Sequence, residues 1–364
     1  MGRNIYENRI STDWQSKIRI SIKKTVLAAS MLLCAMTLPA YGDSTQFLTT
    51  GSARTRALAM GGAYHSLKDD FSAGFYNPGA FQLQATRNER RFRLLFNPQA
   101  AAVGLYDYSR YNRDFVEDNK LTPSEVLLSM ALLIKGIVYT TPIMDLGIGL
   151  GEEVIEYTGQ ESLSGRMFSV KGLTRSSFHS VFLNLKIASP VSLGMTGTLY
   201  NSRTNNSDTY KGGYTFGVLL TPNPKMNVGI VYNKIPDDFS SARLELECIE
   251  NGAATSGISY YPDDKTVLSI DLRTINKENQ ATSREIHTGV ERRFGRRLAL
   301  RAGYYRKKTT KHDIISFGIG ILPLWEKVSK FYNSTRTDII SYSLIMEENS
   351  FKRRWHVLSL LLRF

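Results

Sequence analysis

Apolar and polar residues alternate in segment after segment from about Arg91 to the end of the chain. In one run, Leu183, Leu185 and Ile187 take every second position, and Asn184 and Lys186 stand between them. Successive side chains of a β-strand point to opposite faces, so this period of two predicts a strand with one apolar face. Turn or polar residues separate the segments. The pattern predicts an all-β chain of antiparallel strands.

The alternation fits two classes of protein. In a soluble β-sandwich the apolar face forms the core, whereas in a membrane barrel it meets lipid and the polar face lines the lumen. Three features favour the barrel. The polar faces carry paired charges, such as Asp271 with Arg273, and many glycines. The 19 Tyr and 17 Phe often stand near strand ends, where membrane interfaces collect aromatics. Short turns alternate with longer polar connections. A soluble exported β-sandwich is the alternative.

The last ten residues are the clearest strand. Leu358, Leu360, Leu362 and Phe364 occupy alternate positions, so one side of this strand is wholly apolar. The arrangement resembles the closing strand of outer-membrane β-barrels, which pairs with the first strand. The resemblance implies that these four residues form the signal for the barrel-assembly machinery. Because single-chain bacterial barrels favour even strand numbers, we expect about fourteen strands.

Residues 1–42 have the order of a secretory signal peptide. Basic residues, among them Lys23 and Lys24, precede the uncharged and mostly apolar run Thr25–Leu38, and small residues follow it. We predict cleavage after Gly42. A membrane anchor is the alternative, although the run is short for the ~20 residues of a spanning helix. Only Cys248 would remain after cleavage, and export without disulfides indicates the cell envelope of a diderm bacterium.

Charge and candidate chemistry narrow the function classes. The formal net charge is +13, but Lys and Arg are dispersed, so we assign them to loops and the lumen and expect no nucleic-acid partner. The five histidines lack metal-ligand spacing. Gly147, Gly149 and Gly151 alternate without the following helix of a nucleotide-binding loop, and we interpret them as lumen glycines. No motif selects a Ser–His pair. The sequence predicts no metal, no cofactor and no enzyme activity.

One segment between the strands predicts a helix. Thr122 is a good N-cap, with Pro123 and Glu125 at the first and third helical positions. The run Val126–Ile134 is apolar nearly all round, and residues 135–136 are a plausible stop. Such a helix must bury itself against the barrel or contribute to a groove for a lipid-like ligand; both interpretations stay open. The candidate groove residues are Leu127, Leu128, Leu132 and Leu133.

Residues 51–81 resemble the N-terminal hatch of the FadL-like outer-membrane proteins. This superfamily also contains the PorV-type proteins associated with protein secretion. Its pattern is an Arg-Ala-x-x-Met-Gly-Gly-Ala stretch, an Asp-Asp pair with small residues, and Asn-Pro. The matching residues are Arg56, Ala57, Met60, Gly61, Gly62, Ala63, Asp69, Asp70, Ser72, Ala73, Asn77 and Pro78. Gly79-Ala80 departs from the usual Ala-Gly order.

The resemblance implies a signal peptide over 1–42, a hatch over 43–88 and a transmembrane β-barrel over 89–364. It implies an outer-membrane channel that takes up hydrophobic molecules, with long-chain fatty acids as the prototype, and releases them sideways into the bilayer lipid beside a kinked strand. The alternative is a PorV-type barrel that holds an exported protein partner. The implied hatch and gating residues are Arg56, Met60, Gly61, Gly62, Asp69, Asp70, Asn77, Pro78 and Gly79.

Overall fold

The chain divides into two compact units, Met1–Ser44 and Thr45–Phe364. The structure is a computed structural model that describes residues 46–50, 54–69, 71–82, 92–96, 134–149, 155–156, 178–204, 207–235, 253–275, 282–295, 297–308, 311–322, 339–348, 354–360 and 362–363. The predicted signal peptide lies outside these residues. So do Asp70, Leu127, Leu128, Leu132, Leu133 and Phe364.

Within the described residues, seventeen strands form one sheet. Fourteen of them succeed one another as antiparallel neighbours, as the sequence predicts. The ring closes through β17 (Leu362–Arg363), which follows β16 and pairs with β2, Leu362 opposite Phe96 and Arg363 opposite Leu95. The fourteen strands are β2 (Phe92–Phe96), β3 (Ile134–Thr140), β4 (Met144–Gly149), β6 (Phe178–Ala188), β7 (Val191–Thr204), β8 (Ser207–Asn223), β9 (Met226–Lys234), β10 (Ala253–Tyr260), β11 (Thr266–Ile275), β12 (Ser283–Phe294), β13 (Leu298–Lys307), β14 (His312–Ile321), β15 (Ile340–Glu348) and β16 (Arg354–Leu360).

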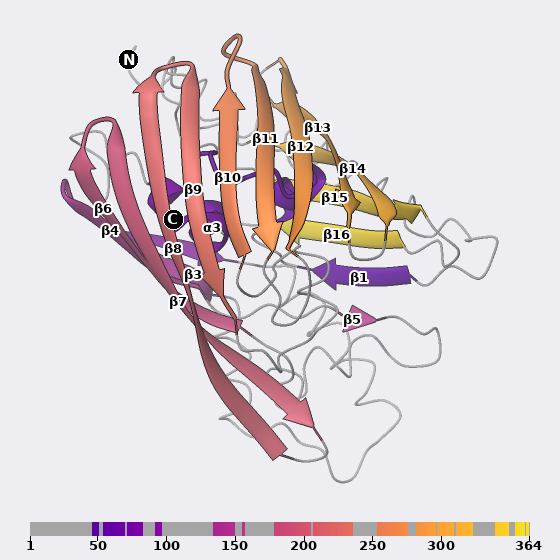
Figure 1. Ribbon diagram of the computed structural model, residues 1–364, viewed down its shortest axis with the longest axis horizontal. Helices are drawn as coiled ribbons and strands as arrows, with labels where there is room; N and C mark the ends of the chain where they lie inside the picture. Colours follow the sequence, from indigo (N-terminus) through magenta and orange to yellow (C-terminus); the bar gives the residue numbers. More distant parts are fainter. Residues whose placement is uncertain are drawn as a thin grey trace, which may run out of the picture. The chain divides into compact units, whose positions relative to one another are not determined.

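Two further strands extend the sheet beside β16. β1 (Gln46–Thr50) runs parallel to β16, with Leu48 opposite His356, and antiparallel to β5 (Ile155–Glu156). Figure 1 shows β1 and β5 next to β16. The closing strand therefore has β15 on one side and β1 on the other, and only its continuation β17 meets β2.

The exposed fractions of the side chains on the two faces of the sheet show whether its outer face requires water or lipid. Ile270 and Ile286 are 57% and 58% exposed, whereas their polar neighbours Asp271 and His287 are fully buried. A soluble sandwich has the opposite arrangement. The same exposure recurs around the ring, and a continuous apolar outer surface of this extent needs lipid rather than water. The structure is that of a transmembrane barrel. Other exposed outward residues include Ile148, Val181, Phe216, Ile230, Ile258 and Phe317.

Five short connections lie at the end of the barrel where the closing strand ends, whereas the short β7–β8 and β13–β14 connections lie at the opposite end. Leu360 pairs with Ile340, Ile340 with Ile321, and Ile321 with Leu298, which follows the short β12–β13 turn. The β3–β4, β6–β7, β8–β9 and β10–β11 connections are also short. We call this end the short-turn end. Among the described residues, no helix has both the length and the apolar character to cross a membrane.

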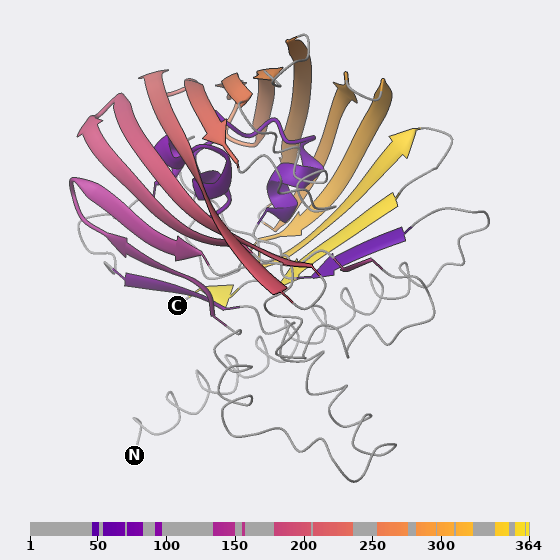
Figure 2. The same cartoon turned by 60° about the horizontal axis from the view of Figure 1, so that its bottom comes forward.

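Residues 54–69 and 71–82, which we call the inner segment, lie on the concave side of the sheet (Figure 2). They form α2 (Thr55–Ala59), α3 (Phe71–Tyr76) and the 3₁₀ turn η1 (Pro78–Ala80). α2 contacts β13 to β16, and η1 contacts β6, β7 and β8. The sequence analysis did not predict these helices, because five or six residues are too few to show a helical period.

One boundary from the sequence analysis is wrong. Residue 134 was expected to end a helix and residues 135–136 to stop it, but Ile134–Thr140 forms β3. Within β3, Gly136 pairs with Gly149 and Thr140 with Asp145. Pairing with β4 satisfies the backbone here, so sheet contacts outweigh the local helix signal. Residues 122–133 lie outside the described residues, and their helix stays a prediction.

Candidate functional site

Hydroxyl groups that project inward from successive strands bind backbone carbonyls of the inner segment. The pairs are Ser343–Thr55 at 2.7 Å, Ser316–Ala59 at 3.1 Å, Ser259–Ser66 at 3.1 Å, Thr196–Gly74 at 2.7 Å and Ser192–Gly79 at 2.7 Å. As the inner segment advances from residue 55 to 79, its partners move back from β15 to β7. Buried carbonyls need donors, so the small polar residues inside the barrel hold the inner segment against the wall.

Arg56 joins the inner segment to β12 by a two-pronged ion pair. Its Nε and Nη2 donate to the two carboxylate oxygens of Glu291 at 2.8 and 3.1 Å. Its Nη1 lies 3.2 Å from Oδ2 of Asp69, and Arg301 of β13 donates its Nε to Glu291 at 2.7 Å. Bidentate Arg–carboxylate pairs are strong and directional. Two residues of the hatch pattern, Arg56 and Asp69, therefore meet in one buried charge cluster with two wall residues.

Tyr64 extends this cluster, because its hydroxyl donates to the Asp69 carboxylate. Burial raises the pKa of the Tyr64 phenol well above its ordinary value, although the nearby Arg56 acts in the opposite direction. The phenol is consequently a protonated donor at neutral pH.

Asp271 of β11 holds the turn that follows Tyr64. One carboxylate oxygen accepts from the backbone N–H groups of Tyr64 and His65 at 2.8 and 3.0 Å, and it lies 2.7 Å from Nδ1 of His65. We expected Asp271 to pair with Arg273 on its own strand. The carboxylate instead binds the inner segment, which the strand pattern alone could not reveal.

Met60, Gly61 and Gly62 come against β12 and β13. Gly61 and Gly62 have φ of +64° and +73°, the left-handed region that favours glycine. The carbonyl oxygen of Gly61 accepts from Nδ1 of His287 at 2.8 Å. On the wall, a Cβ added to Gly289 would lie 2.6 Å from the Met60 carbonyl oxygen. Close backbone approach thus requires glycine on both sides of this contact.

Asn77 folds the chain around the next corner. Its Nδ2 donates to the carbonyl oxygens of His65 at 2.6 Å and Val218 at 3.1 Å, and its Oδ1 accepts from the N–H of Gly79 at 2.9 Å. The side chain is fully buried. Asn77 therefore ties the two halves of the inner segment to each other and to β8.

Asn184 of β6 supplies the matching donor from the wall. Its Nδ2 donates to the carbonyl oxygens of Pro78, Gly79 and Phe81 at 3.1, 2.9 and 2.6 Å. A Cβ added to Gly79 would lie 2.9 Å from the carbonyl oxygen of Gly217. This contact explains the departure from the usual Ala-Gly order, because the chain presses against β8 at residue 79.

An apolar cluster occupies the other side of the inner segment. The ring of Phe182 on β6 lies 4.8 Å from that of Phe75 and 5.6 Å from that of Phe81, centroid to centroid. Leu95 of β2 and Val138 of β3 are buried in the same cluster. The remaining members are Ala73, Ala80 and Leu219. Towards β11 to β13, the described lumen therefore holds the Arg56–Glu291 charge cluster. Towards β2 to β8 it combines this apolar cluster with polar side chains, among them Asn184, Ser192 and Asp145, the last of which pairs with Lys186.

The structure brings together most of the residues that the hatch resemblance implies, namely Arg56, Met60, Gly61, Gly62, Asp69, Asn77, Pro78 and Gly79. Their wall partners were not singled out from the sequence: Asn184, Asp271, His287, Glu291 and Arg301. The available signal was a charged or amide side chain on the polar face of a strand whose other face is apolar. Such residues must find a partner inside the barrel.

No protein-family model and no curated protein matches the chain. Solved structures that it resembles include the CymD monoaromatic hydrocarbon channel, with 11% sequence identity and a TM-score of 0.44 over 86% of this chain and 96% of that one. A TodX deltaS2S3 mutant monoaromatic hydrocarbon channel has 12% sequence identity and a TM-score of 0.45 over 86% of this chain and 97% of that one. A triple mutant of the Rhodopseudomonas blastica porin has 12% sequence identity and a TM-score of 0.32 over 63% of this chain and 75% of that one.

The fold of this chain is described by its own strand pairing and by the exposure of its two faces.

Proposed function

We propose that this chain is a FadL-like outer-membrane channel for hydrophobic molecules. In this proposal, residues 43–88 form a hatch inside a barrel of residues 89–364. The observation that carries it is the two-sided lumen. Towards β11 to β13 the inner segment is bound through ions and hydrogen bonds, whereas towards β2 to β8 it meets an apolar cluster beside the hydrogen bonds of Asn184 and Ser192. An apolar guest could displace the contacts of the apolar cluster and leave the contacts of Arg56 and Asp271 intact.

The proposed route runs through the apolar cluster to β2. Leu95 belongs to this cluster, and the register between β2 and β3 shifts at Leu95/Phe96. A shift of this kind bends a strand and weakens its pairing locally. Among the described residues, β2 pairs with the closing strand through Leu362 and Arg363 alone. These features support a lateral exit beside β2, from which the guest enters the bilayer.

Residues 122–133, for which the sequence predicts a helix, stand between β2 and β3 in the chain, and in this proposal the helix belongs to the same side. Leu127, Leu128, Leu132 and Leu133 are therefore proposed to line the ligand's path. Replacing the four leucines with Ser should weaken ligand binding while the barrel still folds. If ligand binding is unchanged, the helix only packs against the barrel and does not contact the ligand.

Long-chain fatty acids are the proposed guests, following the family prototype. Monoaromatic hydrocarbons are the second candidate, and the rings of Phe75, Phe81 and Phe182 favour them. Edge-to-face and tilted aromatic contacts such as these can be exchanged for contacts with a guest ring. A fatty acid would instead place its alkyl chain against the same surfaces.

A binding titration tests the proposal. The chain from residue 43 onward is refolded in detergent, its folding is verified by heat-modifiable migration on a gel, and a fluorescent long-chain fatty acid is added. Saturable binding that oleate displaces supports the fatty-acid channel. Displacement by toluene but not by oleate assigns the hydrocarbon class. A folded barrel that binds neither contradicts the channel and favours the PorV-type alternative, for which capture of one discrete exported protein is the corresponding test.

A further inference from the structure

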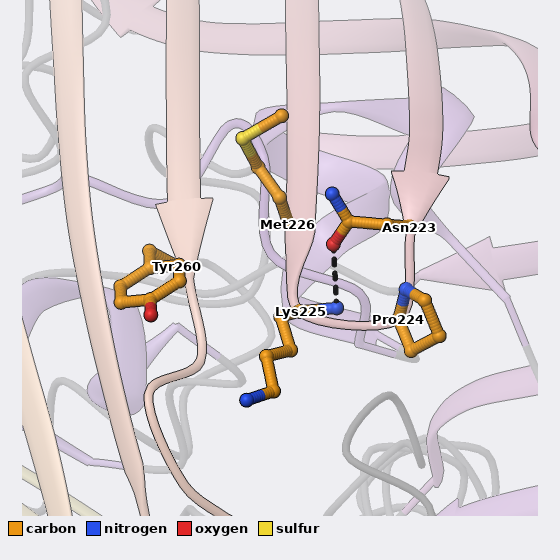
Figure 3. A pocket seen from close by; sticks show the side chains of 5 residues that line it. All are labelled: Asn223, Pro224, Lys225, Met226 and Tyr260. Atoms are coloured by element: carbon orange, nitrogen blue, oxygen red, sulfur yellow. Dashed lines mark hydrogen bonds between the residues drawn. The ribbon is translucent and has the colours of Figure 1, made fainter.

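A groove opens on the outer face of the barrel at the short-turn end. Its volume is about 460 Å³, and it is lined by Asn223, Pro224, Lys225, Met226 and Tyr260. Figure 3 shows the side chains of Met226 and Tyr260 above the turn that carries Lys225. Met226 of β9 and Tyr260 of β10 are register partners. Two neighbouring strands and the β8–β9 turn therefore form the groove.

The groove faces lipid and not the lumen. Tyr260 is 46% exposed and shares its face with Ile258, which is 52% exposed, whereas Ser259 between them is fully buried. The last two outward residues of β10, Ile258 and Tyr260, are thus apolar or aromatic. Aromatic rings at such a boundary lie at the level of the lipid headgroups. The neighbours of this groove are bilayer lipids.

The turn below the groove is fixed by its own hydrogen bonds. Oδ1 of Asn223 accepts from the N–H of Lys225 at 2.9 Å, and the carbonyl oxygen of Lys225 accepts from the N–H of Tyr261 at 2.8 Å. The second bond joins the β8–β9 turn to the β10–β11 connection. Lys225 itself is exposed. A cationic side chain consequently stands at the rim of an apolar groove on a rigid support.

Charge along this rim favours an anion. The exposed basic residues on adjacent turns are Lys225, Lys265, Arg292 and Arg297, and the exposed acidic residues of the same row are Asp263 and Asp264. The Asp263 carboxylate accepts from the N–H of Lys265 at 2.7 Å and the hydroxyl of Thr266 at 3.1 Å. Among the described residues of this row, four basic and two acidic exposed side chains leave a net positive charge beside the groove.

We propose that the groove binds one anionic glycerophospholipid from the leaflet at the short-turn end. An acyl chain lies between Met226 and Tyr260, and the phosphate is held by Lys225. The inference rests on the lipid-facing orientation of the barrel and not on transport of any guest. Loss of ligand binding in the lumen would leave it standing.

Tyr260→Trp provides the probe for this site, because Trp keeps an aromatic ring at the groove. The full chain carrying Tyr260→Trp is reconstituted in phosphatidylcholine vesicles, and its fluorescence is quenched with brominated phosphatidylglycerol or brominated phosphatidylcholine. The same protein with Tyr260 retained supplies the background from the native tryptophans. One basic residue near an anionic lipid surface is worth roughly a fivefold preference, and this is the expected selectivity for phosphatidylglycerol.

Two variants in the Tyr260→Trp background decide the role of Lys225. Lys225→Gln should reduce the preference to about one, while Lys311→Gln, which removes the same charge from an exposed turn at the opposite end, should preserve it. Equal quenching by the two lipids in the parent would overturn the proposal. So would a preference that survives Lys225→Gln in a protein whose folding is confirmed by heat-modifiable migration.

Discussion

Arg56 and Glu291 are 235 positions apart in the chain and meet inside the barrel through two hydrogen bonds of 2.8 and 3.1 Å. The pair ties α2 to β12, and Glu291 also accepts from Arg301. Buried charges of this kind tolerate no loss of a partner, because the remaining charge is left away from water. The pair therefore fixes the inner segment to one side of the wall.

Glu291→Gln should loosen the inner segment and make the barrel leaky. Removing one partner of a buried ion pair costs on the order of 3–5 kcal/mol, here by leaving Arg56 and Arg301 undercompensated. The measurements are single-channel conductance in a planar bilayer and the urea midpoint of unfolding. Glu348→Gln, at the exposed end of β15, should change neither. Closed channels and an unaltered midpoint for Glu291→Gln would refute the anchoring role.

Gly61→Ala should destabilise the protein more than an alanine at an open position. The φ of Gly61 is +64°, and an added Cβ would lie 2.9 Å from the backbone nitrogen of Tyr304. The left-handed conformation alone costs a non-glycine residue about 1–2 kcal/mol. Gly197→Ala is the matched control, since an added Cβ there has nothing within 4 Å. Equal unfolding midpoints for the two variants would show that the inner segment does not press on β13.

Asn184→Leu should expose the second half of the inner segment. Three carbonyl oxygens, those of Pro78, Gly79 and Phe81, would lose the same donor. Pro78 keeps the N–H of Phe81 and Gly79 keeps the hydroxyl of Ser192, so the cost of about 1–3 kcal/mol for an unsatisfied buried group falls on the Phe81 carbonyl. Limited chymotrypsin digestion at Tyr76 and Phe81, which lie in this half, should accelerate in this variant. Asn223→Ala, in the exposed β8–β9 turn, serves as the control and should leave the digestion rate unchanged.

High pH should weaken the contacts of Tyr64. Burial raises the pKa of its phenol in the folded chain, so the folded state holds the proton more tightly than the unfolded state does. Its contribution to stability is complete below the unfolded pKa of about 10 and falls as pH rises beyond it. Unfolding midpoints measured from pH 8 upward should drop less steeply for Tyr64→Phe. Parallel curves would contradict the assignment.

The strands could be predicted from the sequence because each carries its own signal. The alternation of Ile270 and Asp271 predicts that their side chains lie on opposite faces of the strand. Gly147 and Gly149, which the sequence analysis interprets as lumen glycines, are buried. Which face meets lipid could not be derived from the period alone. The exposure of Ile270 and the burial of Asp271 settle it.

For the contacts between the inner segment and the barrel wall, the sequence predicted the residues of the inner segment but not their partners on the wall. The hatch pattern singled out Arg56, but nothing local to residue 291 indicates its partner, since that contact depends on the register of the whole ring. Helix α2 has too few residues for a periodic signal. At Ile134, pairing with Phe96 of β2 outweighs a local helix signal. These outcomes are long-range effects, which a single sequence does not display.

The most direct test of the channel is a comparison of two phenylalanines. Phe182 is buried in the apolar cluster, and Phe216 is an outward residue that is 48% exposed. Affinity for the displaceable hydrophobic ligand should fall about tenfold or more in Phe182→Ala, since truncating a buried aromatic contact of this size exceeds 1.4 kcal/mol. Phe216→Ala should bind like the parent. Equal affinities for the two variants, both folded, would contradict a hydrophobic route through the lumen.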